Sequence, residues 1–222
     1  MGDLARSLHE EDSVEDTLQG IVDAAVGTVP GAQYAGLSVI EGRLTVRTRA
    51  GTAGLVHQVD QAQYDTGEGP CLDALYEQHT VRLSDMATET RWPRFTYRSA
   101  ELGVGSMLSF QLYVEKDNLG ALNLYAREKH AFTDESEQVG LLFATDAAVA
   151  MADAQKNQQL SQAMAVRDLI GQAKGILMER HKLTGDQAFA LLVRASQHTN
   201  TKLSEVARYL VETGELRDRI RQ

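Results

Sequence analysis

Residues 167–211 decide how the C-terminal part of the chain folds, and they read RDLIGQAKGILMERHKLTGDQAFALLVRASQHTNTKLSEVARYLV. Apolar residues recur at every third or fourth position in three blocks, at 166–177, 188–195 and 203–210. This is the spacing of residues that share one face of a helix. The stretch therefore predicts three amphipathic helices whose apolar faces close one small core.

Helix start and stop signals separate the three blocks. Thr184 and Gln187 have the spacing of a capping box, which begins the second helix. The polar run at 196–200 ends that helix, because such side chains bond to nearby backbone groups. Asn200 or Thr201 is expected to cap the third helix, and Gly214 is expected to end it.

Three separated motifs in this stretch resemble, in order, the ANTAR family, the RNA-binding domain of bacterial transcription antiterminators. The matching positions are Ile170, Ala173, Lys174, Gly175, Leu177, Met178, Ala188, Phe189, Leu192, Ser196, Gln197, Thr199, Asn200, Lys202, Leu203, Val206 and Ala207. The resemblance implies binding to nascent RNA that carries paired small hairpins with hexanucleotide loops. Binding would prevent a terminator from forming.

Two glycines lie inside the first of these helices, one turn apart and opposite its apolar face. Gly171 and Gly175 stand there beside Arg167, Lys174 and Met178. An interior glycine costs about 1 kcal/mol relative to alanine, so something is expected to require a bare backbone. One interpretation is close approach of an RNA backbone or loop base, with the basic side chains on phosphates. The other is close packing against a second helix.

The turn after the second helix carries amide and hydroxyl groups that could read base edges in an RNA loop, although capping explains Thr199 and Asn200 equally well. Arg180, near the end of the first helix, is expected to bond terminal carbonyls. The expected RNA-binding residues are Arg167, Gly171, Gln172, Lys174, Gly175, Met178, Gln197, Thr199, Asn200 and Lys202.

Length and composition suit a protein of two domains. The chain has 222 residues and 43% hydrophobic content, enough for one sizeable core and a second small one. No apolar run approaches the roughly 20 residues that cross a bilayer, and residues 1–13 lack a signal-peptide core. The single cysteine, Cys71, excludes an intrachain disulfide. A cytoplasmic protein without membrane contact is expected.

The net charge of −9 is unevenly distributed. From Gln162 onward there are ten Lys and Arg against seven Asp and Glu, a net charge of +3. The preceding residues hold 12 basic and 24 acidic side chains, a net charge of −12. Only the C-terminal part is therefore suited to a phosphate backbone.

Helices and strands alternate in the N-terminal part, which predicts an α+β domain with helices flanking a largely antiparallel sheet. We expect a helix capped by Ser13, a hairpin of 34–40 and 44–49 around Glu41-Gly42, helices at 55–64, 72–76 and 95–102, an edge strand at 80–83, and a second hairpin of 106–114 and 120–125 around 116–118. This order resembles a GAF domain over residues 13–151. The motifs that carry the resemblance are GEGPC at 67–71, Trp92-Pro93-x-Phe95 and Phe132-Thr133-x-Glu135.

The only residue with reactive chemistry in this domain is Cys71, which is either a small core residue or a redox or covalent-ligand site. A small-molecule pocket, if the apolar core leaves one, is expected at Cys71, Trp92, Phe95 and Met107. The sequence shows no Ser-His-Asp order, no phosphate-binding loop and no metal-ligand spacing. Neither catalytic residues nor a metal or cofactor is expected.

A long helix is expected to connect the two domains over residues 134–166, because neither Gly nor Pro occurs between 141 and 170. Asp134 and Glu137 have the spacing of a capping box at its start. Mostly small residues recur along it at helical spacing, which indicates a coiled-coil dimer; the alternative is that its first half packs on its own sheet. The expected dimerisation residues are Phe143, Ala147, Ala150, Ala154, Asn157 and Met164.

We therefore expect an N-terminal tail (1–12), a GAF sensor (13–151), the connecting helix and an ANTAR domain (167–222). The expected function is a homodimeric RNA-binding antitermination regulator. One rival is a DNA-binding helix-turn-helix regulator, which three helices and a net +3 would also suit. The other is a redox or small-molecule GAF sensor whose C-terminal helices only dimerise it.

Overall fold

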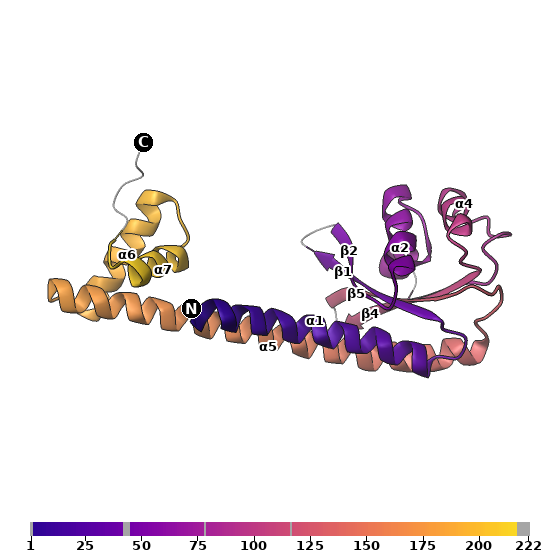
Figure 1. The fold of residues 1–222 in the computed structure, drawn as a ribbon, viewed down its shortest axis with the longest axis horizontal. Helices are drawn as coiled ribbons and strands as arrows, with labels where there is room; N and C mark the ends of the chain where they lie inside the picture. The colour runs from indigo at the N-terminus through magenta and orange to yellow at the C-terminus, as the bar shows by residue number, and fades with distance from the viewer. Residues whose placement is uncertain (1, 42–44, 78, 116, 217–222) are drawn as a thin grey trace. The chain divides into compact units, whose positions relative to one another are not determined.

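The structure, a computed structural model, describes residues 2–41, 45–77, 79–115 and 117–216. The chain forms two compact units, Leu8–Lys156 and Asn157–Gln222 with Met1–Ser7. The elements are labelled in Figure 1. The helices are α1 Gly2–Thr28, α2 Gly54–Thr66, α3 Pro70–Tyr76, α4 Pro93–Glu101, α5 Asp134–His181, α6 Gly185–Thr199 and α7 Leu203–Thr213. The strands are β1 Tyr34–Glu41, β2 Thr45–Gly51, β3 Thr80–Leu83, β4 Ser106–Val114 and β5 Asp117–Ala126.

The first unit is built on a five-stranded antiparallel sheet with the strand order β2-β1-β5-β4-β3. Pairing of β1 with β5 joins the two predicted hairpins, with Leu37 opposite Leu122. Both hairpins and the edge strand at 80–83 are confirmed. Gly42 and Lys116, in the predicted turns, lie outside the described residues.

Helices cover both faces of this sheet, because alternate side chains of each strand point to opposite faces. On one face, Leu37 and Phe110 join a buried cluster with Val22 of α1 and Ala148 of α5, and Figure 1 shows these two helices side by side along that face. The other face packs under α2, α3 and α4, where Met107 contributes to a second buried cluster. The predicted α+β class is confirmed.

The first helix begins earlier than predicted. α1 starts at Gly2, so Ser13 lies inside it instead of capping it, and residues 2–12 of the expected N-terminal tail are helical. Neither Gly nor Pro occurs between Asp3 and Gln19. Nothing in the backbone there interrupts helix propagation.

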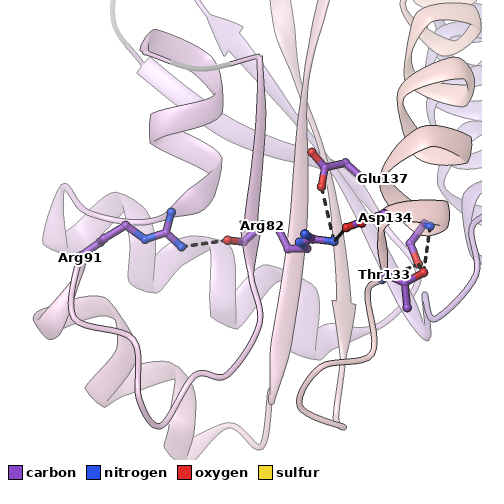
Figure 2. Close-up of polar contacts among 6 residues, drawn as sticks. Arg82, Arg91, Thr133, Asp134 and Glu137 are labelled. Carbon is purple, nitrogen blue, oxygen red and sulfur yellow. Dashed lines mark hydrogen bonds and ion pairs between the residues drawn. The ribbon is translucent and has the colours of Figure 1, made fainter.

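The start of α5 also differs from the prediction. Thr133 and Ser136 form the capping box, with Thr133 N donating to Ser136 Oγ at 3.0 Å and Ser136 N donating to Thr133 Oγ1 at 3.4 Å. The predicted box of Asp134 and Glu137 is wrong, because the two hydroxyls already satisfy the backbone groups at this end. Both carboxylates instead face Arg82 of β3 (Figure 2).

In the second unit, the last part of α5 packs with α6 and α7 around a core that includes Leu177, Leu192 and Leu210. The three predicted helices and the Thr184–Gln187 capping box are confirmed. The cap of α7 is not as predicted. Asn200 ends α6 in the left-handed conformation (φ 50°), which asparagine tolerates. Lys202 precedes α7 without a side-chain cap.

Candidate functional site

Gly171 and Gly175 of α5 face open space. A Cβ built on either glycine would meet no atom within 4 Å among the described residues, apart from the backbone of the helix itself. On the other side of the helix, Ala173 and Leu177 are buried. Within the described part of the chain, helix packing therefore does not account for these two glycines.

An exposed aromatic ring lies under the neighbouring lysine. Lys174 Nζ stands 6.0 Å from the ring centroid of Phe189 on α6, within reach of a cation–π interaction. Phe189 is 41% exposed and Met178 is 38% exposed. Gly185 lies beside both α5 side chains, since a Cβ there would be in ordinary van der Waals contact with them, 3.6 Å from Lys174 Nζ and 3.9 Å from Met178 Sδ.

We refer to these residues as the Lys174–Phe189 face, and its members are Gly171, Lys174, Gly175, Met178, Gly185 and Phe189. Phe189 was not among the expected RNA-binding residues. The available signal was its position about 100° around α6 from the buried Ala188, outside the apolar stripe.

The turn between α6 and α7 combines structural and exposed groups. Thr199 is buried, and its hydroxyl donates to the Ala195 carbonyl at 2.7 Å, so it stabilises the end of α6. Gln197, Asn200 and Lys202 are exposed. Only these three side chains of the predicted set are free to meet a ligand at the turn.

The structure does not bring the two predicted groups of RNA-binding residues together. Lys174 lies over Phe189 in the first half of α6, whereas Asn200 forms the C-terminal cap of that helix. At 1.5 Å per residue, the path along α6 from Phe189 to Asn200 is roughly 16 Å. One nucleotide base could not contact both groups.

A surface groove of about 650 Å³ lies between α5 and α7 and is lined by Gln172, Gly175, Ile176, Glu179, Arg180 and Val211. Arg180 donates from Nη1 to the carbonyl of Gly214, which ends α7. The predicted role of Arg180 in bonding a terminal carbonyl is confirmed. Arg167 is exposed beside Asp168, with 3.7 Å between Nε and Oδ1.

In the sensor domain, the four residues predicted for a ligand pocket are packed in the interior. Trp92, Phe95 and Met107 belong to one buried apolar cluster, and none is more than 4% exposed. Cys71 is fully buried in a smaller cluster with Leu75 and Ala121. All four side chains are therefore shielded from solvent.

A buried carboxylate, which the sequence analysis missed, lies over the same face. Asp60 of α2 accepts hydrogen bonds from Thr48 Oγ1 at 2.7 Å, Gln63 Nε2 at 3.2 Å, Asn123 Nδ2 at 3.4 Å and the Tyr125 hydroxyl. All four donors are neutral side chains. Burial raises the pKa of Asp60 to about 6, although the Tyr125 and Thr48 hydrogen bonds oppose the shift.

The network around Asp60 extends to Cys71. The Cys71 backbone N–H donates to Gln63 Oε1 at 2.8 Å, and its Sγ lies 3.5 Å from Ser38 Oγ. Gly69 permits this loop path, because it has φ 139° and the Gln63 side chain packs where a Cβ would stand. Burial raises the pKa of the Cys71 thiol to about 12, which keeps it protonated and a weak nucleophile.

The network also approaches the surface through Tyr64. Its hydroxyl lies 2.7 Å from Ser38 Oγ and 3.0 Å from Thr48 Oγ1. Tyr64 and Thr48 line a polar groove of about 490 Å³ between β2 and α2, together with Thr45, Val46, Arg47, His57 and Gln61.

The residues predicted for dimerisation fall into two groups. Ala147 is buried in the sensor core, and Phe143 and Ala154 pack against that core. Ala150, Asn157 and Met164 are exposed. Between Asp134 and Arg167, the other large apolar side chains exposed on α5 are Leu141, Leu142, Val149, Leu160 and Val166.

Neither a metal site nor a membrane-spanning helix is found among the described residues. No cluster of three or more His, Cys, Asp or Glu side chains there could hold a metal ion. No helix in the same part of the chain combines the length and apolar character needed to cross a membrane.

Comparison with known structures shows similarity over the first unit. A domain of a protein described as a two-component sensor histidine kinase from Sinorhizobium meliloti 1021 has 18% identity and a TM-score of 0.53, covering 64% of this chain and 92% of that one. The GAF domain region of a protein described as a membrane protein from Geobacter sulfurreducens PCA has 12% identity and a TM-score of 0.53, covering 65% and 97%. The type II free methionine-R-sulfoxide reductase from Thermoplasma acidophilum has 14% identity and a TM-score of 0.51, covering 65% and 96%. At these identities the likeness concerns the fold alone.

Family models divide the chain as its architecture does. The comparison with curated proteins gives no match. The model of the GAF domain matches residues 11–152, and the model of the ANTAR domain matches residues 158–211. The chain therefore belongs to the GAF family of sensor domains and carries, C-terminal to it, an ANTAR domain, the RNA-binding domain of transcription antiterminators.

Proposed function

We propose that this protein is a dimeric antitermination regulator that binds RNA hairpin loops through the Lys174–Phe189 face. The observation that carries the proposal is the pair of interior glycines that face open space beside an exposed ring and an ammonium group. Without a bound partner, two interior glycines do not stabilise this helix. Two glycines weaken the helix by about 2 kcal/mol in all relative to alanine, so a partner outside the described chain is the better explanation.

The chemistry of the face suits an unpaired RNA loop. Proteins that recognise RNA loops commonly stack splayed bases on aromatic rings. Phe189 offers such a ring on α6, and Lys174 lies where it can contact the adjoining phosphate. Gly171 and Gly175 leave a surface on α5 onto which a sugar-phosphate backbone can approach closely.

Charge supports the same assignment. The residues from Gln162 onward carry a net +3, whereas the rest of the chain carries −12. Non-specific phosphate contacts supply much of the affinity for nucleic acid and weaken with salt. The sensor domain should repel RNA and thereby confine binding to the C-terminal helices.

Dimerisation would match two ANTAR domains to the paired hairpins that the family resemblance implies. Leu142 and Val149 are seven residues apart on α5 and are 72% and 49% exposed. Two such helices in parallel would bury them against each other. Once one hairpin is bound, the second contact becomes intramolecular, which raises avidity without any new interaction.

The signal is proposed to reach the RNA-binding helices through α5, which begins on the sensor sheet and ends within the ANTAR core. A signal can act only if it binds two arrangements of the dimer with different affinity.

Fluorescence anisotropy with the full-length protein tests the proposal. The probes are an RNA with two hairpins and hexanucleotide loops, the same stems with shortened loops, and duplex DNA. We expect tight binding to the first probe only. Phe189→Leu should weaken it about five- to a hundredfold, the loss of one stacked base, and Lys174→Gln should lower the salt slope by about 1.

Lys156→Gln is the matched control, because Lys156 is a lysine of the same helix that is exposed and lies outside the Lys174–Phe189 face. It should bind like the wild type. Equal affinity for duplex DNA would favour the helix-turn-helix alternative. Tight RNA binding that is unchanged by Phe189→Leu and Lys174→Gln would reject this face as the interface.

A further inference from the structure

A chain of polar contacts runs from α3, around the edge strand β3, to the first turn of α5. It passes from Asp73 through Trp92 and Arg91 to Arg82, and its last part is drawn in Figure 2. All of its members lie in the first unit. It is separate from the Lys174–Phe189 face and from the predicted dimer contacts.

The contacts at the α5 end come from one arginine. Val81 and Leu83 are buried against the α2–α4 side of the sheet, so Arg82 between them points to the side covered by α5. Arg82 Nη1 lies 2.9 Å from Asp134 Oδ1 and 3.6 Å from Glu137 Oε2 (Figure 2). The Arg82 side chain is 31% exposed, and the two carboxylates flank the first turn of α5.

The backbone of Arg82 is held from the other direction. β3 is an edge strand, so its outer carbonyls have no strand partner. Arg91 Nη2 donates to the Arg82 carbonyl at 2.8 Å. The same guanidinium bonds Glu89 at 2.6 Å and lies 4.1 Å from the ring centroid of Trp92. Arg91 thus holds the backbone of Arg82, while Asp134 and Glu137 hold its side chain.

Trp92 connects this arginine pair to the helix that carries Cys71. The indole is 4% exposed, and its Nε1–H donates to Asp73 Oδ2 at 3.0 Å. Asp73 lies on α3, two residues after Cys71, whose backbone is bonded to Gln63 in the network around Asp60. A displacement of α3 would therefore pull on Trp92 and Arg91.

We propose that Arg82 is a coupling residue, a latch that transmits displacement of α3 and the Trp92 segment to the first turn of α5. This goes beyond the proposed RNA binding and rests on it only in assuming that α5 carries the signal. Contact chains alone do not establish coupling, so the latch must be tested by non-additivity.

The test measures amide hydrogen exchange of residues 137–141 in the full-length protein for the wild type, Arg91→Gln, Arg82→Gln and the double variant. Arg82→Gln should raise exchange about two- to fivefold, as expected for the loss of a partly exposed ion pair. Arg91→Gln does not touch α5, yet it should raise exchange there when Arg82 is present. In the Arg82→Gln background it should add nothing.

Arg94→Gln is the control, because Arg94 forms a similar ion pair with Glu68, 2.7 Å apart, outside the contact chain. It should leave residues 137–141 unchanged. The proposal is overturned if Arg91→Gln has no effect on α5, or if its effect is the same with and without Arg82. RNA affinity of the wild type is measured separately, so a protein that fails to bind RNA would sink the proposed function without deciding the latch.

Discussion

Asp60 is a carboxylate held entirely in the interior of the sensor domain, and every described side chain that hydrogen-bonds to it is neutral. Desolvation disfavours its charged form, whereas four donors favour that form. The balance leaves its pKa at about 6, above the ordinary value of 3.8. A group with a raised native pKa binds its proton more tightly in the folded state than in the unfolded state.

The sensor domain should therefore lose stability as Asp60 ionises. The contribution of Asp60 is fully present below pH 3.8 and is lost as the pH rises through about 6. Between pH 5 and pH 7.5 the wild type should lose about 1–2 kcal/mol of unfolding free energy from this group. Asp60→Asn should remove that loss. Denaturant unfolding followed by Trp92 fluorescence measures it, since Trp92 is the single tryptophan and lies in the sensor core.

Asp65→Asn is the control for this experiment, because Asp65 is an exposed aspartate of the same helix. It should keep the pH dependence of the wild type. If Asp60→Asn also keeps it, the carboxylate is not the group that titrates in this range.

At the scale of the helix, α5 combines segments with different partners. Its first part packs on the sensor sheet through Ala147 and Ala148, and its last part forms the ANTAR core through Ala173 and Leu177. Gly171 and Gly175 interrupt neither its hydrogen bonding nor its core face. We attribute the retention of these two glycines, despite their cost in helix propensity, to the proposed RNA partner.

Replacing Gly171 and Gly175 by alanine should separate binding from stability. The double variant should unfold at higher denaturant concentration, because alanine favours the helix by about 1 kcal/mol at each site and each Cβ meets open space. RNA affinity should fall at least tenfold, since the added methyl groups block close approach. Circular dichroism and anisotropy measure the two effects. A more stable protein with unchanged affinity would show that the bare backbone serves another purpose.

At the scale of the whole molecule, dimerisation depends on which face of α5 is left unpartnered. The predicted residue Ala147 is already used in the sensor core, while the larger Leu142, Val149, Leu160 and Met164 are exposed. Covering an exposed apolar side chain with a partner stabilises the dimer by about 25 cal/mol for each Å² of apolar surface removed from water. We therefore expect Leu142, Val149 and Leu160, together with Met164 of the predicted stripe, to contribute more to a dimer than the small residues of that stripe.

Replacing Leu142 and Val149 by glutamate should convert the protein from dimer to monomer, because like charges would face each other across a parallel pair. Multi-angle light scattering measures the mass. Ala150→Glu, an exposed position of the predicted stripe, should perturb the dimer less. The monomer should also lose preference for an RNA with two hairpins over one with a single hairpin. A wild type that is monomeric at micromolar concentration would contradict both expectations.

Local sequence signals determined the elements. Alternation of apolar and polar residues identified the two hairpins, and the Thr184–Gln187 capping box identified the start of α6. The absence of Gly and Pro from residues 141–170 identified the unbroken α5. Each of these signals depends only on residues that are neighbours in the sequence. The glycine pair and Lys174 were likewise visible as a face of one helix. The uneven distribution of charge identified the C-terminal part, from Gln162 onward, as the part suited to nucleic acid.

Tertiary structure decided what depends on residues far apart in the chain. Asp60 follows the buried Val56 and Val59 on the apolar stripe of α2, yet only the arrival of Tyr125 and Asn123 from β5 makes a buried carboxylate tolerable there. The placement of Lys174 over the Phe189 ring became visible only in the folded chain. Arg82 became a contact of α5 because the sheet edge lies against that helix, 52 residues later in the chain. The periodicity of side chains along a helix or strand predicts which residues share a face. Which other element packs against that face depends on tertiary contacts between residues far apart in the sequence.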